Sequence, residues 1–302
     1  MIYTLTLNPA LDYIMSVEKL RFDDINRSGG EKIFYGGKGI NVSVILNRLG
    51  IENVALGFLG GFSGEKLKSL LEADNIACDF NTIKGDTRIN VKIKTETELD
   101  INAMGPDVTE EEIEELLKKT DMIKGGDYLV LAGSIPRSIP SDIYVRILER
   151  LKDRNVKFVV DTTGSSLLEV LKYKPFLIKP NHHELGDIFG KEIKTEEEII
   201  EYANKLKSMG AQNVLVSRAA DGALLVDKNG DIFAAPRIEG KLISSVGCGD
   251  SMVAGFIAGY IKEKDYAYAL KLGTACGSAT AFSEGLATSD KINFVLTHGF
   301  NK

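Results

Sequence analysis

Short aliphatic runs alternate with amphipathic segments along most of this 302-residue chain, and this alternation limits the folds open to it. The runs are almost continuously apolar, which is typical of strands buried on both faces of a parallel sheet. The expected strands are Ile2–Leu7, Val54–Phe58, Tyr128–Ala132, Lys157–Asp161, Phe176–Ile178 and Val214–Ser217. The sequence therefore predicts an α/β fold with a doubly wound, mainly parallel sheet.

Helical periodicity fills the intervals between these strands. Apolar residues recur at helical spacing in Gly39–Leu49, Ser63–Asn75 and Thr195–Met209. The last segment begins with a capping box, in which Thr195 and Glu198 stand three residues apart. No repeat or interdomain linker is visible, so we expect residues 1–302 to form a single domain.

Two stretches, about 13–35 and 88–104, break this rhythm because they have strand character without intervening helices. The second stretch alternates with a period of two, as at Ile89, Val91 and Ile93. We expect the two stretches to pair as a small separate sheet, a lid that excludes water from a ligand site. A pair of surface hairpins is the alternative.

Charge and hydropathy exclude several classes of protein. The chain has 37 Lys and Arg against 43 Asp and Glu, a net charge of −6, which argues against a nucleic-acid-binding protein. Its longest run without charged residues is 12 residues, whereas a membrane-spanning helix needs about 20 apolar residues. The three cysteines lack CxxC spacing, and the N-terminus lacks a basic signal region. We therefore expect a cytoplasmic protein without membrane or nucleic-acid partners, although a small basic pocket for an anionic metabolite remains compatible.

The segment Ser244–Ile261 carries the strongest local motif. Gly247 and Gly249 lead directly into an apolar helix that starts near Asp250. Glycines allow close approach to a ligand, and the free N–H groups of a helix N-terminus bind anions. A carboxylate inside such a site is suited to accept a proton from a hydroxyl while the amides stabilise phosphoryl charge. The alternative is an Asp N-cap after a glycine turn.

A second glycine cluster opens the helix at Gly39–Leu49. Gly36, Gly37 and Gly39 surround Lys38, which places a cation beside exposed backbone donors. This arrangement suits a phosphate or a sugar rich in hydroxyl groups, and it lacks the spacing of a Walker A loop. A glycine-rich turn with an incidental lysine is the alternative.

Three weaker signals follow or lie on predicted strands. Asp12 comes after the first strand, where carboxyl ends of parallel strands bind ligands such as sugars. Asn181 and Glu184 are three residues apart at a helix start, where both can reach a metal–phosphate assembly or simply cap the helix. Arg88 and Asn90 share one face of a lid strand, where Arg88 is either a phosphate ligand or an ordinary edge-strand arginine.

These motifs occur in an order that resembles the PfkB/ribokinase family of carbohydrate kinases. The resemblance rests on the segments NPALD, GGKGIN, GSIP, KPNHHEL, SRAADGA and VGCGDSMVAG, and it covers essentially the whole chain. It implies a ribokinase-like α/β domain with a β-sheet lid, ATP and Mg²⁺ as cofactors, and a homodimer formed through the lids.

Two lid segments narrow the substrate that the resemblance implies. Thr87–Lys92 and Thr97–Pro106 are similar to those of members that convert fructose 1-phosphate to fructose 1,6-bisphosphate. Kinases of tagatose 6-phosphate are close relatives and give the alternative substrate. A kinase of nucleosides or unphosphorylated sugars and a non-catalytic sugar-phosphate sensor are further alternatives.

The resemblance also implies roles for residues at the matching positions. Asp250 is the expected base, and the expected anion hole comprises Gly247, Cys248 and Gly249. The residues expected to hold the sugar are Asp12, Gly37, Lys38 and Asn41. The clamp expected on the substrate's own phosphate comprises Arg88, Asn90 and Lys38.

The expected nucleotide site comes from the C-terminal half of the chain. The Mg²⁺ and the ATP phosphates are assigned to Asn181, Glu184 and Lys179, with Glu184 as the residue nearest the metal. The loop expected to line the nucleotide comprises Ser217, Arg218, Ala219, Ala220, Asp221 and Gly222. The helix around Ala275 to Ser283 is expected to lie along the adenine.

The chain departs from the family pattern at two of these positions. Cys248 stands where the family usually has Ala or Ser, and a thiol there is a possible target for alkylation or oxidation. Ala219 stands where the family typically has glycine, so its methyl group either crowds a phosphate or requires an unusual φ.

Overall fold

All six expected strands belong to one nine-stranded sheet in the computed structural model, which describes residues 1–96 and 98–300. The strands that match are β1 (Ile2–Thr6), β4 (Asn53–Leu59), β8 (Tyr128–Ala132), β9 (Lys157–Asp161), β10 (Leu177–Ile178) and β11 (Val214–Ser217). The sheet is completed by β5 (Asn81–Thr82), β12 (Ala223–Val226) and β13 (Ile232–Ala235). Its order is β13-β12-β11-β10-β9-β8-β1-β4-β5, and its two antiparallel pairings are β11 with β12 and β12 with β13. The predicted mainly parallel sheet is confirmed.

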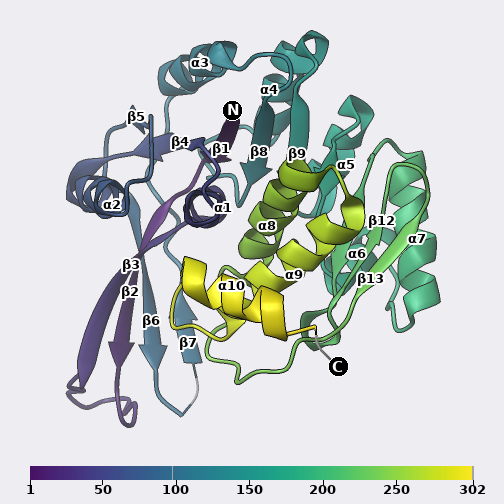
Figure 1. Cartoon of the computed structure of the whole chain (residues 1–302). Helices are drawn as coiled ribbons and strands as arrows, with labels where there is room; N and C mark the ends of the chain where they lie inside the picture. Colours follow the sequence, from purple (N-terminus) through teal and green to yellow (C-terminus); the bar gives the residue numbers. More distant parts are fainter. Residues whose placement is uncertain (97, 301–302) are drawn as a thin grey trace.

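Helices cover both faces of this sheet (Figure 1). One face carries α3 (Glu110–Lys119), α4 (Ile143–Leu151), α5 (Gly164–Val170), α6 (His182–Phe189) and α7 (Glu196–Ser208). The other face carries α1 (Lys38–Arg48), α8 (Cys248–Glu263), α9 (Tyr266–Ala281) and α10 (Ser289–His298). The remaining helix, α2 (Gly61–Ala73), packs against α1 in a third apolar cluster. The chain is therefore doubly wound, as its alternating pattern predicts.

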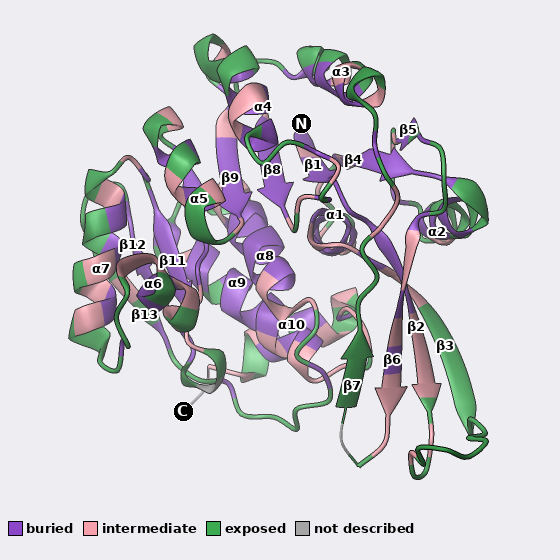
Figure 2. Cartoon of the chain, turned by 180° about the vertical axis from the view of Figure 1, so that it is seen from behind, coloured by how far each residue is buried: buried purple, intermediate pink, exposed green. Residues whose placement is uncertain are grey.

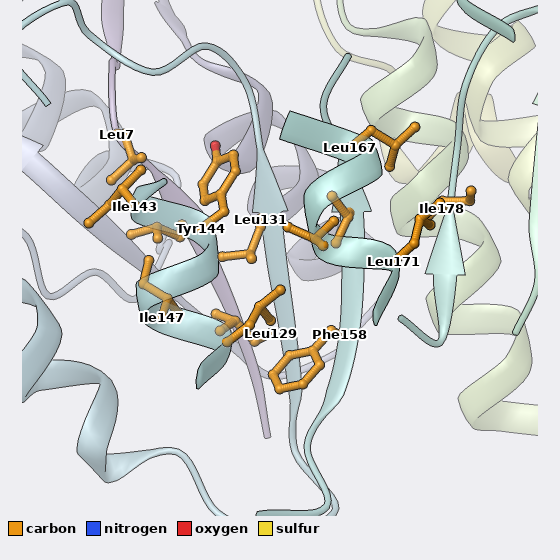
Figure 3. Packing of buried hydrophobic residues seen from close by; sticks show 14 of the residues in the cluster. Leu7, Leu129, Leu131, Ile143, Tyr144, Ile147, Phe158, Leu167, Leu171 and Ile178 are labelled. Atoms are coloured by element: carbon orange, nitrogen blue, oxygen red, sulfur yellow. The ribbon is translucent and has the colours of Figure 1, made fainter. Parts of the chain in front are cut away.

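Burial on both faces explains why the strands lack alternation of polar and apolar residues. Leu129 and Leu131 of β8 belong to the core under α3–α7, whereas Tyr128 and Val130 belong to the core under α1 and α8–α10. Figure 3 shows the first core, where Ile147 of α4 lies beside the side chains of the central strands. Each strand residue thus has an apolar environment on whichever side it points.

A second sheet of four strands projects from the main body, and it has the order β3-β2-β6-β7 within the described residues. Its strands are β2 (Ala10–Ser16), β3 (Gly30–Gly36), β6 (Arg88–Lys94) and β7 (Glu98–Ile101). Two hairpins are joined by parallel pairing of β2 with β6, so they form one sheet rather than separate surface hairpins. The predicted small separate sheet is confirmed, and its first strand begins at Ala10.

No helix within residues 1–96 and 98–300 combines the length and apolar character that crossing a membrane requires.

Replacing Ile147 by alanine tests the core under α4. Ile147 is fully buried, so Ile147→Ala should lower the free energy of unfolding by about 2–5 kcal/mol through lost contacts and a residual cavity. Phe294→Ala is the control, because Phe294 is 59% exposed on α10 and its removal should cost much less. Urea denaturation of both variants measures the difference, and equal losses would contradict this assignment of the core.

Candidate active site

A large cavity lies at the carboxyl ends of the central strands and has a volume of about 990 Å³. The chain runs from β1 to β4 on one side and returns to β8 on the other side of β1. Such a reversal of strand order creates a crevice, where open α/β sheets bind their ligands. The small sheet and the start of α8 complete the lining of this cavity.

Asp250 lies in the first turn of α8 and is buried, with 5% of its surface exposed. The helix begins after Gly247, whose φ of 76° is a left-handed conformation that favours glycine. Asn41 of α1 donates from Nδ2 to Asp250 Oδ2 at 2.8 Å and fixes the orientation of the carboxylate. The first N–H groups of α8 therefore lie beside an oriented carboxylate, as the glycine loop predicts.

The pKa of Asp250 is raised to about 6. Burial is the main cause, and repulsion from the carboxylate of Asp161 adds to it. The hydrogen bond from Asn41 and the charges of Lys38 and Lys179 oppose the shift. A carboxylate with this pKa is a better proton acceptor near neutral pH than an ordinary aspartate.

Asp161 joins two lysines beneath this helix turn. It ends β9, is almost fully buried, and accepts a hydrogen bond from Lys38 Nζ at 3.2 Å. Lys179 Nζ lies 3.7 Å from the same oxygen, Asp161 Oδ1. Burial lowers the pKa of Lys38, but the attraction of Asp161 and Asp250 outweighs it and leaves the pKa above its ordinary value. Lys38 is thus held as a cation at the Asp250 end of the cavity, and Lys179 lies beside the same carboxylate.

Sequence reasoning missed Asp161, although it located the strand that Asp161 ends. The signal was an acidic residue at the carboxyl end of an uninterrupted apolar strand, where a parallel sheet presents ligand-binding side chains. Sequence reasoning also missed Lys92, which lies on the same face of β6 as the predicted site residues Arg88 and Asn90. The signal was its alternate position on that strand. Both residues line the cavity.

Gly249 allows Lys179 to approach the start of α8. A Cβ at position 249 would lie 3.2 Å from Lys179 Nζ and 3.3 Å from its Cε, closer than side chains normally pack. A larger residue would therefore push this ammonium group away from the N–H groups of the first turn. The glycine predicted to permit close approach here makes room for a cation of the protein itself.

The small sheet contributes a hydrogen-bonded polar face to the cavity. Asn90 of β6 donates to Asp12 Oδ1 of β2 at 2.8 Å, and both side chains are buried. Arg88 donates from Nε and Nη2 to the carbonyl of Asn8, at 3.2 and 2.9 Å, and from Nη1 to Ala103 at 3.1 Å. Burial lowers the pKa of Arg88, and the charge of Asp12 opposes that shift. The predicted sugar and phosphate residues of this sheet therefore do line one cavity.

Asn181 and Glu184 form a capping box at the start of α6. Asn181 Oδ1 accepts from the Glu184 backbone, and Glu184 Oε2 accepts from the Asn181 backbone, each at 2.8 Å. Both residues also line the cavity together with Lys179. The cap and a role toward a bound ion are compatible, because a carboxylate has a second oxygen to offer.

The predicted nucleotide loop is divided between cavity and surface. Ser217, Ala219 and Gly222 line the cavity. Arg218 instead pairs with Glu196 of α7, with Nη1 at 2.8 Å from Oε2. The side chain of Ala220 and all of Thr97, the first residue of a segment used for the resemblance, lie outside the described part of the chain.

Ala219 has a φ of 50°, the left-handed conformation that glycine adopts without cost. The departure from glycine at this position therefore preserves the backbone conformation, at a cost of about 1 kcal/mol for an alanine. Of the two consequences expected from the sequence, an unusual φ is the one observed.

One face of α9 forms a wall of the same cavity. Its residues recur at helical spacing: Thr274, Gly277, Ser278 and Ala281, followed by Phe282. Thr274 Oγ1 is buried and has no hydrogen-bond partner among the described residues. The segment predicted to lie along an adenine thus presents small side chains and a polar atom to the cavity.

Cys248 is a half-buried residue at the start of α8. Burial raises the pKa of its thiol to about 11, and the charge of Asp250 adds to that shift. The thiol is therefore protonated at neutral pH, and we interpret Cys248 as a small filling residue rather than a reactive group.

Comparison with known proteins matches this geometry to one family. The family model described as pfkB family carbohydrate kinase matches residues 6–293. The chain is 48% identical to 1-phosphofructokinase of Bacillus subtilis, covering 98% of this chain and 97% of that protein. It is 38% identical to D-tagatose-1-phosphate kinase of Bacillus licheniformis, covering 97% and 96%. The crystal structure of phosphofructokinase-2 from Escherichia coli in complex with substrates and products has a TM-score of 0.94 at 27% identity, covering 99% of each chain.

Replacing Asp250 by asparagine should stabilise the protein above pH 6. Because the pKa of Asp250 is higher in the folded state, the folded state loses stability as the pH rises from about 4 to above 6. Asp250→Asn removes this loss, so its free energy of unfolding should exceed that of the unchanged protein by about 1–3 kcal/mol at pH 8.

Urea denaturation at pH 4.5 and pH 8 measures this difference, which should shrink at the lower pH. Asp290→Asn, on the exposed first turn of α10, is the control and should change stability little at either pH. A variant destabilised equally at both pH values would contradict the raised pKa.

Proposed function

The chain belongs to the pfkB family of carbohydrate kinases, and we propose that it transfers the γ-phosphoryl group of ATP to fructose 1-phosphate, producing fructose 1,6-bisphosphate. The observation that carries this proposal is the position of Asp250. Its carboxylate is buried at an anion-binding helix start, with a cavity large enough for both substrates in front of it. The 48% identity to a 1-phosphofructokinase over almost the whole chain supports fructose 1-phosphate as the acceptor.

Asp250 accepts the proton of the sugar hydroxyl that attacks the phosphoryl group. Its pKa of about 6 keeps it ionised at neutral pH but basic enough to take part in the transfer. Asn41 holds the carboxylate in place through one oxygen, which leaves the other oxygen for the hydroxyl. Because the transition state of phosphoryl transfer is loose, a weak base in the correct position is sufficient.

Stabilisation of the transferring phosphoryl group comes from backbone and cations together. The N–H groups of residues 248–250 form the anion hole, and Gly247 and Gly249 keep it open to the ligand. Lys179 lies against Gly249, and Lys38 shares Asp161 with it. These charges are already in position before substrate binds, so little reorganisation is needed during the reaction.

Glu184, with Asn181, is the residue that we assign to Mg²⁺ accompanying the ATP phosphates. No cluster of three or more His, Cys, Asp and Glu side chains able to hold a metal occurs among the described residues. One carboxylate is nevertheless compatible with Mg²⁺. This ion keeps several water ligands, and substrate phosphates supply others. The ion neutralises phosphate charge when bound. Ser217, Ala219 and Gly222 then line the nucleotide, and α9 lies along its adenine.

The small sheet acts as the lid over the sugar. Asp12 and Asn90 bind sugar hydroxyls together with Gly37 and Asn41, while Arg88 attracts the phosphate that the substrate already carries. Closing this sheet over the cavity excludes water, which would otherwise accept the phosphoryl group.

The lid is also the surface that we propose for a homodimer. Figure 2 shows this sheet projecting from the main body, with most of its outer strands β3 and β7 exposed. Arg88, Asn90 and Lys92 of β6 line the cavity, so Ile89, Val91 and Ile93, at the alternate positions, face the other way. Residues directly opposite one another in the sheet share a face, so Tyr13, Val91 and Ile101 lie together on the outer side. Ile101 is 55% exposed there. A second copy of the chain, presenting the same apolar face, covers it.

Activity toward a panel of acceptors tests the proposed reaction. With Mg-ATP, ADP release should be fastest with fructose 1-phosphate, compared with tagatose 1-phosphate, tagatose 6-phosphate, fructose 6-phosphate and free fructose. Tagatose 1-phosphate is included because the chain is 38% identical to a D-tagatose-1-phosphate kinase. Asp250→Asn should lower kcat by at least about 10²–10⁴-fold while remaining folded, and Asp290→Asn should retain full activity.

Preference for a tagatose phosphate would change the substrate and leave the mechanism intact. Turnover of free fructose alone would contradict a sugar-phosphate kinase, and near-normal turnover by Asp250→Asn would contradict its role as the base. Absence of turnover with every acceptor would favour a sugar-phosphate sensor.

A charge on the outer face of the lid should separate the dimer. Ile101→Asp places a carboxylate in the proposed apolar interface, so the variant should sediment as a monomer at micromolar concentration, where the unchanged chain sediments as a dimer. Phe294→Asp, at an exposed apolar position on α10, is the control and should remain dimeric. A dimer of unchanged stability in Ile101→Asp would place the interface elsewhere.

A further inference from the structure

Lys92 is a buried lysine on the inner face of the lid. It follows Arg88 and Asn90 at alternate positions of β6, so all three side chains lie on one side of the sheet. Only 6% of its surface is exposed, and it lines the main cavity. Burying an ammonium group is costly unless the charge has a partner. A lysine kept in this position therefore calls for a functional reason.

The partner of Lys92 is a carboxylate at the edge of the lid. Lys92 Nζ lies 3.2 Å from Asp100 Oδ2 of β7, the residue directly opposite it in the sheet. The Asp100 side chain is 38% exposed, so water solvates it well if the ion pair opens. An anion that enters the cavity is thus able to replace Asp100 as the partner of Lys92, without leaving a second buried charge unpaired.

Two other cations of the cavity, Lys38 and Arg88, already have partners. Lys38 bonds to Asp161, and the charges that raise its pKa are those of Asp161, Asp250 and Glu184, all at the phosphoryl-transfer end. On the lid, the residues facing the cavity include only Arg88 and Lys92 as cations among the described lining residues. Arg88 donates hydrogen bonds to two backbone carbonyls, those of Asn8 and Ala103, and thereby holds the lid strand to the adjoining loops.

The chemistry of the substrate requires a cation at the lid end. In fructose 1-phosphate the phosphate and the hydroxyl that reacts are carried on carbons 1 and 6, at opposite ends of the sugar. If the reacting hydroxyl lies at Asp250, the phosphate lies away from Lys38 and toward the inner face of the lid. There, Lys92 offers a point charge besides the guanidinium of Arg88.

We propose that Lys92 is a specificity-determining residue that binds the substrate's own phosphate, and that Asp100 is the counter-ion that this phosphate replaces. The proposal rests on the proposed function, since it places fructose 1-phosphate with its reacting hydroxyl at Asp250. It assigns the phosphate clamp to Arg88 and Lys92, and it leaves Lys38 to the transferring phosphoryl group. Asp100 neutralises the charge of Lys92 in the absence of substrate and competes with weakly bound anions.

Steady-state kinetics of the full chain with Mg-ATP separate this role from a structural one. Lys92→Met should raise KM for fructose 1-phosphate by about 10–100-fold, the loss of one charge-assisted hydrogen bond, with little change in kcat or in KM for ATP. Lys92→Arg keeps the charge and should recover part of the affinity. Asp100→Asn removes the competing carboxylate, so it should lower KM for fructose 1-phosphate several-fold.

Lys94→Met is the matched control, because Lys94 lies on the same strand and the same face but lines only the smaller neighbouring cavity. Its KM values should remain unchanged. Opposite changes in KM for Lys92→Met and Asp100→Asn support the proposal, since loss of a purely structural ion pair would impair both variants alike. A rise in both, or an unchanged KM in Lys92→Met, overturns it.

Inorganic phosphate gives a test that does not depend on turnover. Calorimetry should detect weak binding of phosphate to the unchanged chain, tighter binding to Asp100→Asn and much weaker binding to Lys92→Met. Equal affinities in the three proteins overturn the role of Lys92 even if fructose 1-phosphate is the substrate. The same series of affinities without turnover of any ketose phosphate retains the anion site at Lys92 and contradicts only the proposed reaction.

Discussion

The buried ionic cluster around Asp161 is the interaction on which the site depends. This one carboxylate holds Lys38 from α1 and Lys179 from the segment after β10. Its negative charge also raises the pKa of Asp250 on α8. A buried cluster of this kind is costly to assemble, and large apolar cores on both faces of the sheet offset that cost. The cluster thus fixes the charges beside Asp250, at a cost that the two apolar cores offset.

The two sheets differ in how their faces are buried. The nine-stranded sheet is buried on both faces and uses its carboxyl ends to present charged side chains at one edge. The four-stranded sheet turns its polar side chains toward the cavity and leaves aliphatic side chains outside. The proposed sugar site and the proposed dimer surface therefore lie on opposite faces of one small sheet.

Local sequence signals anticipated much of the site because they act through the backbone. The glycine loop before Asp250 starts α8, and the Asn181–Glu184 pair forms the capping box of α6. Ala219 adopts the φ expected of the glycine that it replaces, since the loop geometry outweighs the cost to one alanine. Asp161 and Lys92 were not predicted, because an acidic residue at the end of a strand and a lysine within a strand are both common in sequences. Only their burial and partners make them unusual.

The sequence by itself determined the order of strands and helices, the small second sheet and most of the residues at the strand ends. Periodicity and turn chemistry are local properties, and they specify where the backbone turns and which residues follow each strand. The tertiary structure alone decided which charges meet. Lys38, Asp161 and Asp250 are separated by 123 and 89 residues, yet they share one end of a cavity. Their pKa values and pairings arise from burial at that edge, which no local pattern records.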